Sequence, residues 1–357
     1  MEKAYLVLQT GEVFEGVSFG APVERTGELV FTTGMCGYIE TLTDPSYYGQ
    51  IVLQTFPLIG NYGVISEDFE GKCRVSGYVV REACEHPSNF RCQGTLDEFL
   101  KAQGVPGISG VDTRALTRIL REHGTMNARI CRMPPENLGE IASYRIVGAV
   151  EAVTSPAVQA LPPEGEKTCR VALIDYGAKA NIMRELQKRG AEVIVLPASV
   201  TAGEVLSLQP DGLMLSNGPG DPAECLDQIE TLRQLAGRLP TFGICLGHQL
   251  LALALGAKTG KLKYGHRGGN QPVKDLLTGR TYVTSQNHGY AVRSDTLPCG
   301  RLRFVNANDQ TCEGIDYPEI NAFTVQFHPE ARSGPHDCNF LFDRFFEQMG
   351  VSTHAAQ

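Results

Sequence analysis

The stretch Pro240-Thr241-Phe242-Gly243-Ile244-Cys245-Leu246-Gly247-His248-Gln249 has the form Gly-x-Cys-x-Gly, with an apolar lead-in and an apolar run, 250–255, after it. This is the layout of a strand, one sharp turn and a helix. The two glycines lack a Cβ, so strand and helix can crowd against the turn, which holds Cys245 strained with its sulfur exposed. At the helix N-terminus, the macrodipole and free N–H groups favour the thiolate and can hold an oxyanion. The pattern therefore predicts a nucleophilic cysteine and disfavours the commoner buried cysteine.

A nucleophilic cysteine needs a base, and the base needs a group that orients it. Downstream, the β-rich run 322–327 ends at His328, followed by a proline and Glu330. Side chains two apart in an extended chain point to the same side, and the proline keeps His328 extended. Glu330 can therefore fix the imidazole while the imidazole faces Cys245. His288 is a second histidine near the site, but no carboxylate stands two residues from it, so we prefer His328 as the base.

Strands and helices alternate around the cysteine motif. We expect strands at Cys169–Asp175, Glu192–Leu196, Gly212–Leu215 and Phe242–Ile244, and helices at Ala180–Arg189 and from Ala202 and Pro222. Near-continuous apolar strands alternating with helices predict an α/β fold with a doubly wound, mainly parallel sheet. Ligands on such a sheet bind at the carboxyl ends of the strands. Cys245 stands at one such end, and the loop Leu215-Ser-Asn-Gly-Pro-Gly-Asp-Pro222 stands at another.

The chain before this region has a different character. Residues 1–150 predict a β-rich α/β domain, with strands at 6–8, 29–32, 50–55 and 75–80 separated by Gly or Pro turns. One helix is expected between an Asp112 cap and Gly124, and its Arg114, Arg118 and Arg121 line up on one face. A solvated face and a docking surface both explain this stripe. Residues 151–168, rich in proline and charge, predict a linker, and 169–357 the second domain.

Composition excludes several classes of function. The 357 residues suffice for two globular domains, and a net charge of −8 without a long basic run disfavours a nucleic-acid partner. No apolar stretch approaches the ~20 residues that span a bilayer. Eleven scattered cysteines without a Cys-x-x-Cys pair disfavour a disulfide framework and a zinc site, so we expect a cytoplasmic protein without a metal.

The order Gly-x-Cys-x-Gly and then His-x-Glu resembles the class I glutamine amidotransferases, which hydrolyse glutamine to supply ammonia. Two stretches of the first domain, 37–63 (Gly-Tyr-Ile-Glu-Thr-Leu-Thr-Asp-Pro-Ser-Tyr-Tyr-Gly and Pro-Leu-Ile-Gly-Asn-Tyr-Gly) and 107–124, narrow the identification. They look like the N-terminal domain of the small, glutamine-hydrolysing subunit of carbamoyl phosphate synthetase. The resemblance covers nearly the whole chain, and the length is similar to the separate bacterial subunit. It implies a role in pyrimidine and arginine biosynthesis.

The resemblance also assigns residues. It gives the catalytic roles to Cys245, His328 and Glu330, and the oxyanion N–H groups to Gly218 and Leu246. It places the remaining glutamine contacts at Ser46, Gly220, Gln249, Asn287, Gly289 and Tyr290. Ser46 belongs to the first domain, so the resemblance implies a site in an interdomain cleft.

No P-loop is present in the sequence, so we expect no cofactor on this chain. The resemblance places ATP and Mg²⁺ on a large synthetase subunit, which receives ammonia through a tunnel and joins it to bicarbonate-derived carboxyphosphate. Three alternatives stay open. One is another class I glutamine amidotransferase, which the N-terminal domain disfavours. The others are a free-standing cysteine hydrolase of γ-glutamyl compounds and a non-catalytic assembly subunit.

Overall fold

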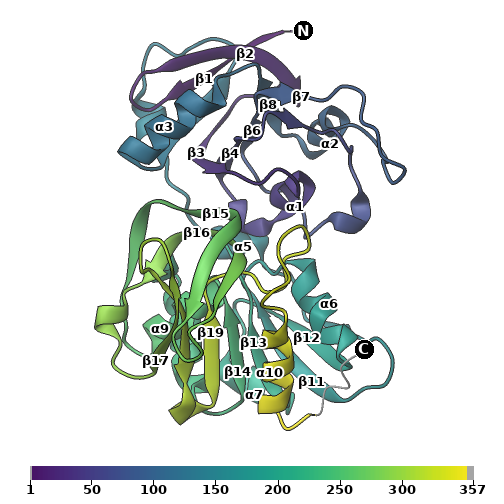
Figure 1. Ribbon diagram of the computed structural model, residues 1–357, viewed down its shortest axis with the longest axis vertical. Coiled ribbons are helices and arrows are strands. Elements are labelled where there is room, and N and C mark those ends of the chain that lie inside the picture. Colours follow the sequence, from purple (N-terminus) through teal and green to yellow (C-terminus); the bar gives the residue numbers. More distant parts are fainter. Residues whose placement is uncertain (1, 352–357) are drawn as a thin grey trace. The chain divides into compact units, whose positions relative to one another are not determined.

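The computed structural model describes residues 2–351. The chain divides into two compact units, Met1–Ala149 and Val150–Gln357, and each is described by itself (Figure 1). Among the described residues, no helix is long and apolar enough to cross a bilayer.

The first unit is built on a closed seven-stranded barrel with the strand order β1-β2-β8-β6-β4-β3-β9. Its strands are β1 (Lys3–Leu8), β2 (Val13–Gly20), β3 (Arg25–Thr32), β4 (Gln50–Gln54), β6 (Gly77–Val79), β8 (Pro106–Ser109) and β9 (Met126–Cys131). The short strands β5 (Leu58–Ile59) and β7 (Glu82–Ala83) pair beside it, and the helices are α1 (Tyr38–Thr43), α2 (Leu96–Gln103), α3 (Thr113–His123) and α4 (Gly139–Ala142). The four predicted strands correspond to β1, β3, β4 and β6.

The sequence did not predict β2, β8 and β9. Of these, β2 and β8 contain glycines that resemble turn signals. In the structure these glycines allow close approach between strands. A Cβ on Gly16 would lie 2.4 Å from the Ser109 carbonyl oxygen, and one on Gly107 would lie 2.6 Å from the Phe19 ring. A side chain at either position would therefore force the barrel open.

Alternate residues of the barrel strands build two separate cores. Leu29 and Ile51 pack in one core with Leu116 and Leu120 of α3, while neighbouring residues such as Val30 pack in the other core. The predicted caps of α3 are confirmed. The Asp112 carboxylate accepts the N–H groups of residues 114 and 115 at 3.1 and 3.0 Å, and Gly124 ends the helix. The three arginines of the stripe are exposed.

The second unit contains a ten-stranded sheet in the order β10-β12-β11-β13-β14-β19-β18-β17-β15-β16. Five consecutive strands are parallel: β12 (Ala191–Pro197), β11 (Cys169–Asp175), β13 (Gly212–Leu215), β14 (Thr241–Ile244) and β19 (Ala322–Val325). The others pair antiparallel: β10 (Gln159–Leu161), β18 (Cys312–Tyr317), β17 (Arg301–Asn306), β15 (Thr259–Asp275) and β16 (Thr281–Val292). The α/β class and the parallel strands are confirmed, whereas the antiparallel half was not predicted.

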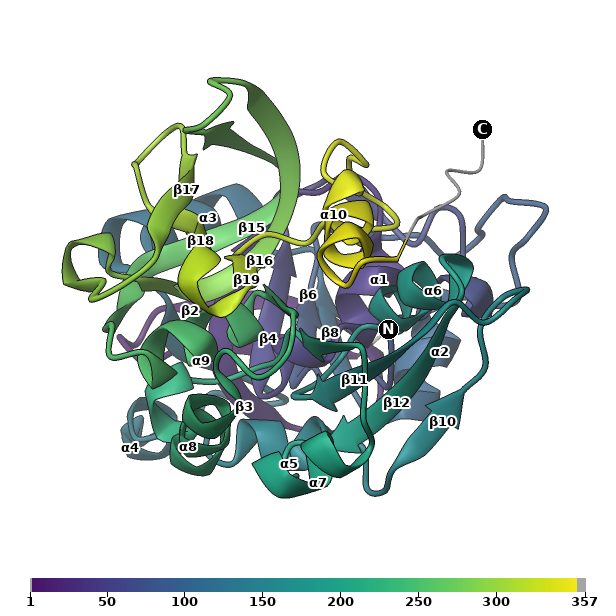
Figure 2. The same cartoon turned by 90° about the horizontal axis from the view of Figure 1, so that it is seen from below.

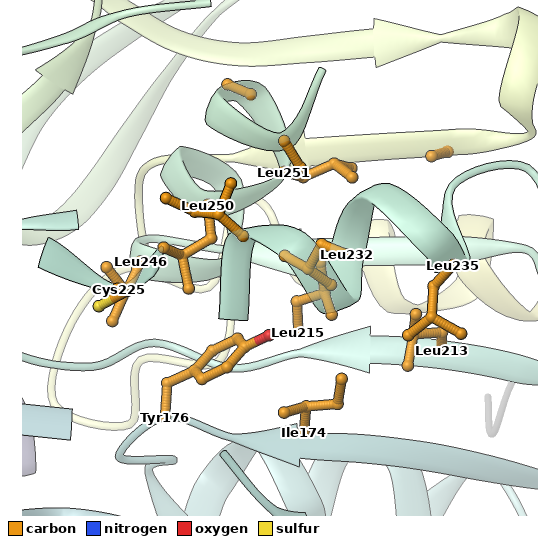
Figure 3. Packing of buried hydrophobic residues seen from close by; sticks show 14 of the residues in the cluster. Ile174, Tyr176, Leu213, Leu215, Cys225, Leu232, Leu235, Leu246, Leu250 and Leu251 are labelled. Atoms are coloured by element: carbon orange, nitrogen blue, oxygen red, sulfur yellow. The ribbon is translucent and has the colours of Figure 1, made fainter. Parts of the chain in front are cut away.

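Helices cover both faces of the parallel half. They are α6 (Ala180–Lys188) and α10 (Phe340–Gln348) on one face, and α7 (Ala202–Ser207), α8 (Leu226–Leu235) and α9 (Leu246–Ala254) on the other (Figure 2). Figure 3 shows the hydrophobic core between the sheet and the face covered by α7, α8 and α9. There Leu213 and Leu215 of the sheet pack against Leu232 and Leu250 of the helices. Each such fully buried leucine stabilises the fold by roughly 1.5–3 kcal/mol. This double layer fixes the strand ends that carry the site.

The segment 151–168, which we expected to be a linker, belongs to the second unit. It contains most of α5 (Ala149–Val153) and the edge strand β10, which pairs antiparallel with β12. Prolines and charged residues are common on and beside edge strands, so here they mark a short edge strand.

Candidate active site

Cys245 lies at the tip of the turn between β14 and α9, with φ 54° and ψ −103°. A residue with a Cβ rarely adopts this conformation and is held in it only by its surroundings. A Cβ on Gly247 would lie 2.5 Å from the Leu215 carbonyl oxygen, and one on Gly243 would lie 3.0 Å from Thr324 Cγ2. The prediction of a strained cysteine between two packed glycines is therefore confirmed.

The prediction of an exposed sulfur is wrong, because Cys245 is only 3% exposed. Its Sγ lies 3.8 Å from the backbone carbonyl oxygen of Asn287, which can accept the S–H proton. Asn287 belongs to β16, a strand of the antiparallel half. A local motif cannot predict that β16 buries the thiol, because β16 lies about 40 residues further along the chain.

The His328–Glu330 pair follows β19, the strand next to β14 in the sheet. The Cys245 N–H donates to the Val325 carbonyl oxygen at 2.8 Å, so the turn and the end of β19 are in direct contact. His328 Nδ1 lies 2.7 Å from Glu330 Oε1, which confirms the predicted His–Glu geometry. His328 Nε2 is buried and has no hydrogen-bond partner among residues 2–351. With Nδ1–H donated to the carboxylate, Nε2 carries the lone pair that can accept a proton.

Glu330 is completely buried, yet it is held as a carboxylate. Burial alone would raise its pKa, but the neighbouring His328 and Lys179 charges and the His328 hydrogen bond lower the pKa of Glu330 to about 2. Lys179 Nζ lies 3.4 Å from Glu330 Oε1. The Asn181 side chain donates to the Glu330 backbone carbonyl. Glu330 is thus fixed in position and charged over the whole physiological pH range.

The glycine loop after β13 lies against the cysteine turn. A Cβ on Gly218 would lie 2.3 Å from the Tyr176 carbonyl oxygen and 2.7 Å from Leu246 Cδ2, so only glycine fits there. Ser216 and Asn217 attach the loop to the segment after β11, since their side-chain oxygens accept the backbone N–H groups of residues 176 and 179 at 2.9 and 3.0 Å. The two predicted oxyanion positions, Gly218 and Leu246, are therefore neighbours on a rigid support.

The other predicted glutamine contacts of the second unit gather on α9 and β16. Gln249 Nε2 donates to the Tyr290 carbonyl oxygen and to Gln326 Oε1, both at 2.8 Å. The same carbonyl oxygen of Tyr290 lies 2.7 Å from His288 Nδ1. Because that oxygen already has two donors, a backbone contact from Tyr290 to a substrate would use its N–H group. These bonds tie the strand segment that includes Asn287 and Gly289 to the cysteine helix.

Two more predicted contacts lie outside α9 and β16, and like the others they stay predictions. Gly220 lies two residues beyond Gly218 in the same loop, with a φ of 94° that suits glycine. Ser46 lies in the first unit, in the short 3₁₀ helix Pro45–Tyr47, where its N–H donates to the Asp44 carboxylate at 2.9 Å.

Two further histidines lie near the turn. His248 Nδ1 is 2.7 Å from Thr324 Oγ1, and burial lowers the pKa of His248 to about 3, which keeps it neutral. Burial, reinforced by the neighbouring His266 charge, also holds the pKa of His288 well below its usual value. Neither ring has an orienting carboxylate on its Nδ1 atom, in contrast to His328. The preference for His328 as the base therefore gains geometric support.

Sequence reasoning missed Lys179, Asn181 and Asn217. Lys179 and Asn181 follow β11, and Asn217 follows β13, so all three stand near carboxyl ends of parallel strands. That position was the available signal, because ligand-binding groups concentrate at these ends. Lysine is rarely buried without a partner, and Lys179 is only 8% exposed.

Comparison with known proteins agrees with this geometry in both units. Residues 6–130 match the family described as carbamoyl-phosphate synthase small chain, CPSase domain. Residues 172–348 match the family described as glutamine amidotransferase class-I. The second match contains the cysteine turn, the glycine loop and the His–Glu pair.

Three relatives that match over nearly the whole chain share one name. The carbamoyl phosphate synthase small chain of Listeria innocua is 51% identical over 358 residues, covering 98% of each chain. The protein of the same name from Listeria monocytogenes is 52% identical over 356 residues, covering 98% of this chain and 97% of the relative. That of Bacillus caldolyticus is 50% identical over 366 residues, covering 99% of this chain and all of the relative.

Proposed function

The chain belongs to the family of carbamoyl phosphate synthase small chains, and from this premise we propose how its residues hydrolyse glutamine and where the ammonia goes. As a member it is the glutamine-hydrolysing subunit of that enzyme, and it supplies ammonia for carbamoyl phosphate synthesis. The observation that carries the proposal is the strained Cys245 beside the His328–Glu330 pair at the ends of adjacent parallel strands.

In the first step, His328 Nε2 takes the thiol proton and the Cys245 sulfur attacks the side-chain amide carbon of glutamine. The oxygen of that amide becomes an oxyanion, which the N–H groups of Gly218 and Leu246 stabilise. The carbon–nitrogen bond then breaks, and His328 returns the proton to the departing ammonia. A glutamyl thioester on Cys245 remains.

In the second step, His328 removes a proton from water, and the hydroxide attacks the thioester carbon. The carbon–sulfur bond breaks, glutamate leaves, and the proton returns to the Cys245 sulfur. Glu330 stays ionised throughout and holds the imidazole in one tautomer, while Lys179 keeps Glu330 ionised. Gln249, Asn287, Gly289, Tyr290 and Gly220 would bind the substrate.

The partner is the large synthetase subunit. Nothing in this sequence resembles a P-loop, so the ATP- and Mg²⁺-dependent steps belong to that partner, and this chain contributes no cofactor to them. We place the protein in the reducing cytoplasm, where its eleven cysteines, free among the described residues, would stay reduced.

The test is to purify the chain alone and together with its large subunit, and to measure glutamine hydrolysis and glutamine-dependent carbamoyl phosphate formation. We expect hydrolysis to be slow for the isolated chain, because uncoupled ammonia would be lost, and to rise in the complex with one carbamoyl phosphate per glutamine. Acid quenching should trap a glutamyl group on Cys245. Fast hydrolysis that ignores the partner would favour the free-standing γ-glutamyl hydrolase instead.

A further inference from the structure

A second cluster of histidine and carboxylate side chains lies in the antiparallel half of the second unit. His266 on β15, His288 on β16 and Glu313 on β18 are at most 9% exposed. One ligand atom from each lies within 4.8 Å of the other two. The two rings stand perpendicular, with centroids 4.9 Å apart. The proposed hydrolysis uses none of these side chains.

Outer hydrogen bonds fix the tautomer of each ring. His266 Nε2 lies 2.8 Å from Asp309 Oδ2, and His288 Nδ1 lies 2.7 Å from the Tyr290 carbonyl oxygen. Both partners are acceptors, so these two nitrogens carry the protons. When both rings are neutral, the remaining nitrogens, His266 Nδ1 and His288 Nε2, carry lone pairs, and each lies 3.2 Å from an oxygen atom of the cluster.

The two lone pairs face oxygen acceptors. Glu313 Oε1 lies 3.2 Å from His266 Nδ1 and 3.8 Å from His288 Nε2. Gln286 Oε1 lies 3.2 Å from His288 Nε2, while the Gln286 amide nitrogen donates to Glu313 Oε2 at 3.0 Å. Two nitrogen and two oxygen atoms thus converge, and their mutual repulsion calls for a shared cation.

A single proton satisfies only one of the two histidines in this arrangement. Placed between His266 and Glu313, it leaves His288 Nε2 facing two oxygen atoms. Placed between His288 and Glu313, it leaves His266 Nδ1 with only the Asn306 amide nitrogen, 3.5 Å away. A metal ion at the centre would accept all four lone pairs at once.

We propose that His266 Nδ1, His288 Nε2, Glu313 Oε1 and Gln286 Oε1 form a structural site for a divalent metal ion of the Zn²⁺ type. Bonds of about 2.0–2.1 Å in a tetrahedron place ligand atoms about 3.3–3.4 Å apart. Three of the ligand pairs lie at 3.2, 3.2 and 3.8 Å, and the His266, His288 and Glu313 atoms lie within 4.8 Å of one another, so the side chains would draw together around the ion. The Asp309 and Tyr290 contacts are the outer bonds that metal-binding histidines make through their second nitrogen. The half-exposed Asp309 side chain links the buried His266 ring to the surface.

This site departs from our expectation of no metal, which rested on cysteine spacing. His266, His288 and Glu313 are too far apart in sequence to form a recognisable motif. The ion would join three antiparallel strands and hold the β16 segment 286–290. That segment covers Cys245 and contains Asn287, Gly289 and Tyr290, so the metal would stiffen the proposed glutamine-binding strand.

The experiment measures metal content, independently of activity. The full chain is produced without a histidine tag in zinc-supplemented medium and desalted. Zinc per chain is then determined by mass spectrometry for the wild type, His266→Asn, Glu313→Gln and two controls. The controls are His336→Asn, which removes an exposed histidine, and Cys245→Ser, which removes the active-site thiol. We expect one zinc per chain in the wild type and both controls, and a small fraction of this in His266→Asn and Glu313→Gln.

Replacement of zinc by Co²⁺ gives a second readout that needs no variant to fold. We expect the visible absorption of tetrahedral Co²⁺ without a thiolate charge-transfer band in the wild type. A wild type that retains neither ion would overturn the proposal, as would zinc retained in folded His266→Asn and Glu313→Gln. Loss of zinc from Cys245→Ser would show that the thiol binds the ion, which would also overturn the proposal. Circular dichroism checks the fold of each variant.

Discussion

The second unit contains two buried histidine–carboxylate pairs that differ in the state of the carboxylate. At the cysteine turn, Lys179 and His328 lower the pKa of Glu330 to about 2. In the antiparallel half, burial raises the pKa of Glu313 to about 7 despite the hydrogen bond to His266. Both glutamates are fully buried, so burial does not explain the difference.

The difference lies in the positive charge that each carboxylate meets. Glu330 has a lysine ammonium 3.4 Å away, whereas the charge that lowers the pKa of Glu313 is that of the His266 imidazole. A buried carboxylate without enough positive charge takes up a proton or binds a metal ion. The first pair is thus built to stay ionised and orient a base, and the second is built to share a cation. Substitutions at these pairs, at the nucleophile and on the first unit test this division.

The largest effect concerns the nucleophile. Cys245→Ser should lower glutamine hydrolysis by a factor on the order of 10³ or more, because the serine hydroxyl is a far weaker nucleophile than the thiolate. The assay is glutamine hydrolysis by the complex with the large subunit. Ammonia-dependent carbamoyl phosphate synthesis by the same preparation is the control and should be unchanged. Near-normal hydrolysis by the serine variant would remove Cys245 from the nucleophile role.

The two carboxylates should differ in kinetics. Glu330→Gln should lower kcat by about 10²-fold or more, because an imidazole in the wrong tautomer or orientation is a poor general base. Glu313→Gln should mainly raise KM, because it loosens the strand that carries the predicted glutamine contacts and leaves the base untouched. Steady-state kinetics with glutamine separates the two outcomes. An equal loss of kcat in both variants would contradict the division of roles.

The ionised state of Glu330 also predicts a pH dependence of stability. Its folded pKa, about 2, lies below the ordinary value of 4.5, so its stabilisation is present above about pH 4.5 and is lost as the pH falls toward 2. Between pH 7 and 3.5 the wild type should lose about 1 kcal/mol more unfolding free energy than Glu330→Gln. Urea unfolding at both pH values measures this, and parallel losses in the two proteins would show that Glu330 titrates normally.

The smallest effect concerns the arginine stripe of the first unit. Arg114, Arg118 and Arg121 on α3 are exposed and form no ion pair among the described residues. If this stripe is the docking surface, reversing two of the charges should weaken association with the large subunit at low salt, and less so at high salt. Sedimentation at two ionic strengths measures the effect, with circular dichroism as the folding control. Unchanged association at low salt would leave the stripe as a solvated face.

Sequence predicted the parts of this molecule whose signals are local. The strained Cys245 follows from glycines two residues away, and the His328–Glu330 contact follows from the alternation of an extended chain. The parallel strands follow from apolar runs between helices. Each of these features depends on residues within about ten positions of one another in the sequence.

What the sequence did not reveal depends on distant pairing. Asn287 covers the thiol only because β16 pairs within the antiparallel half, and the His266–Glu313 contact spans β15 and β18. Lys179 reaches Glu330 from a strand end about 150 residues earlier. Such contacts need the strand order, and alternating polar strands of an antiparallel sheet do not specify their own neighbours.

The central claim is that His328, and not His288, is the base. The decisive measurement is kcat and KM for glutamine hydrolysis by His328→Asn and His288→Asn, side by side in complex with the large subunit. We predict that His328→Asn loses more kcat than Glu330→Gln, because the histidine moves the protons and the glutamate only orients it. His288→Asn should keep most of its kcat and show a raised KM. Wild-type activity in His328→Asn together with an inactive His288→Asn would contradict the account.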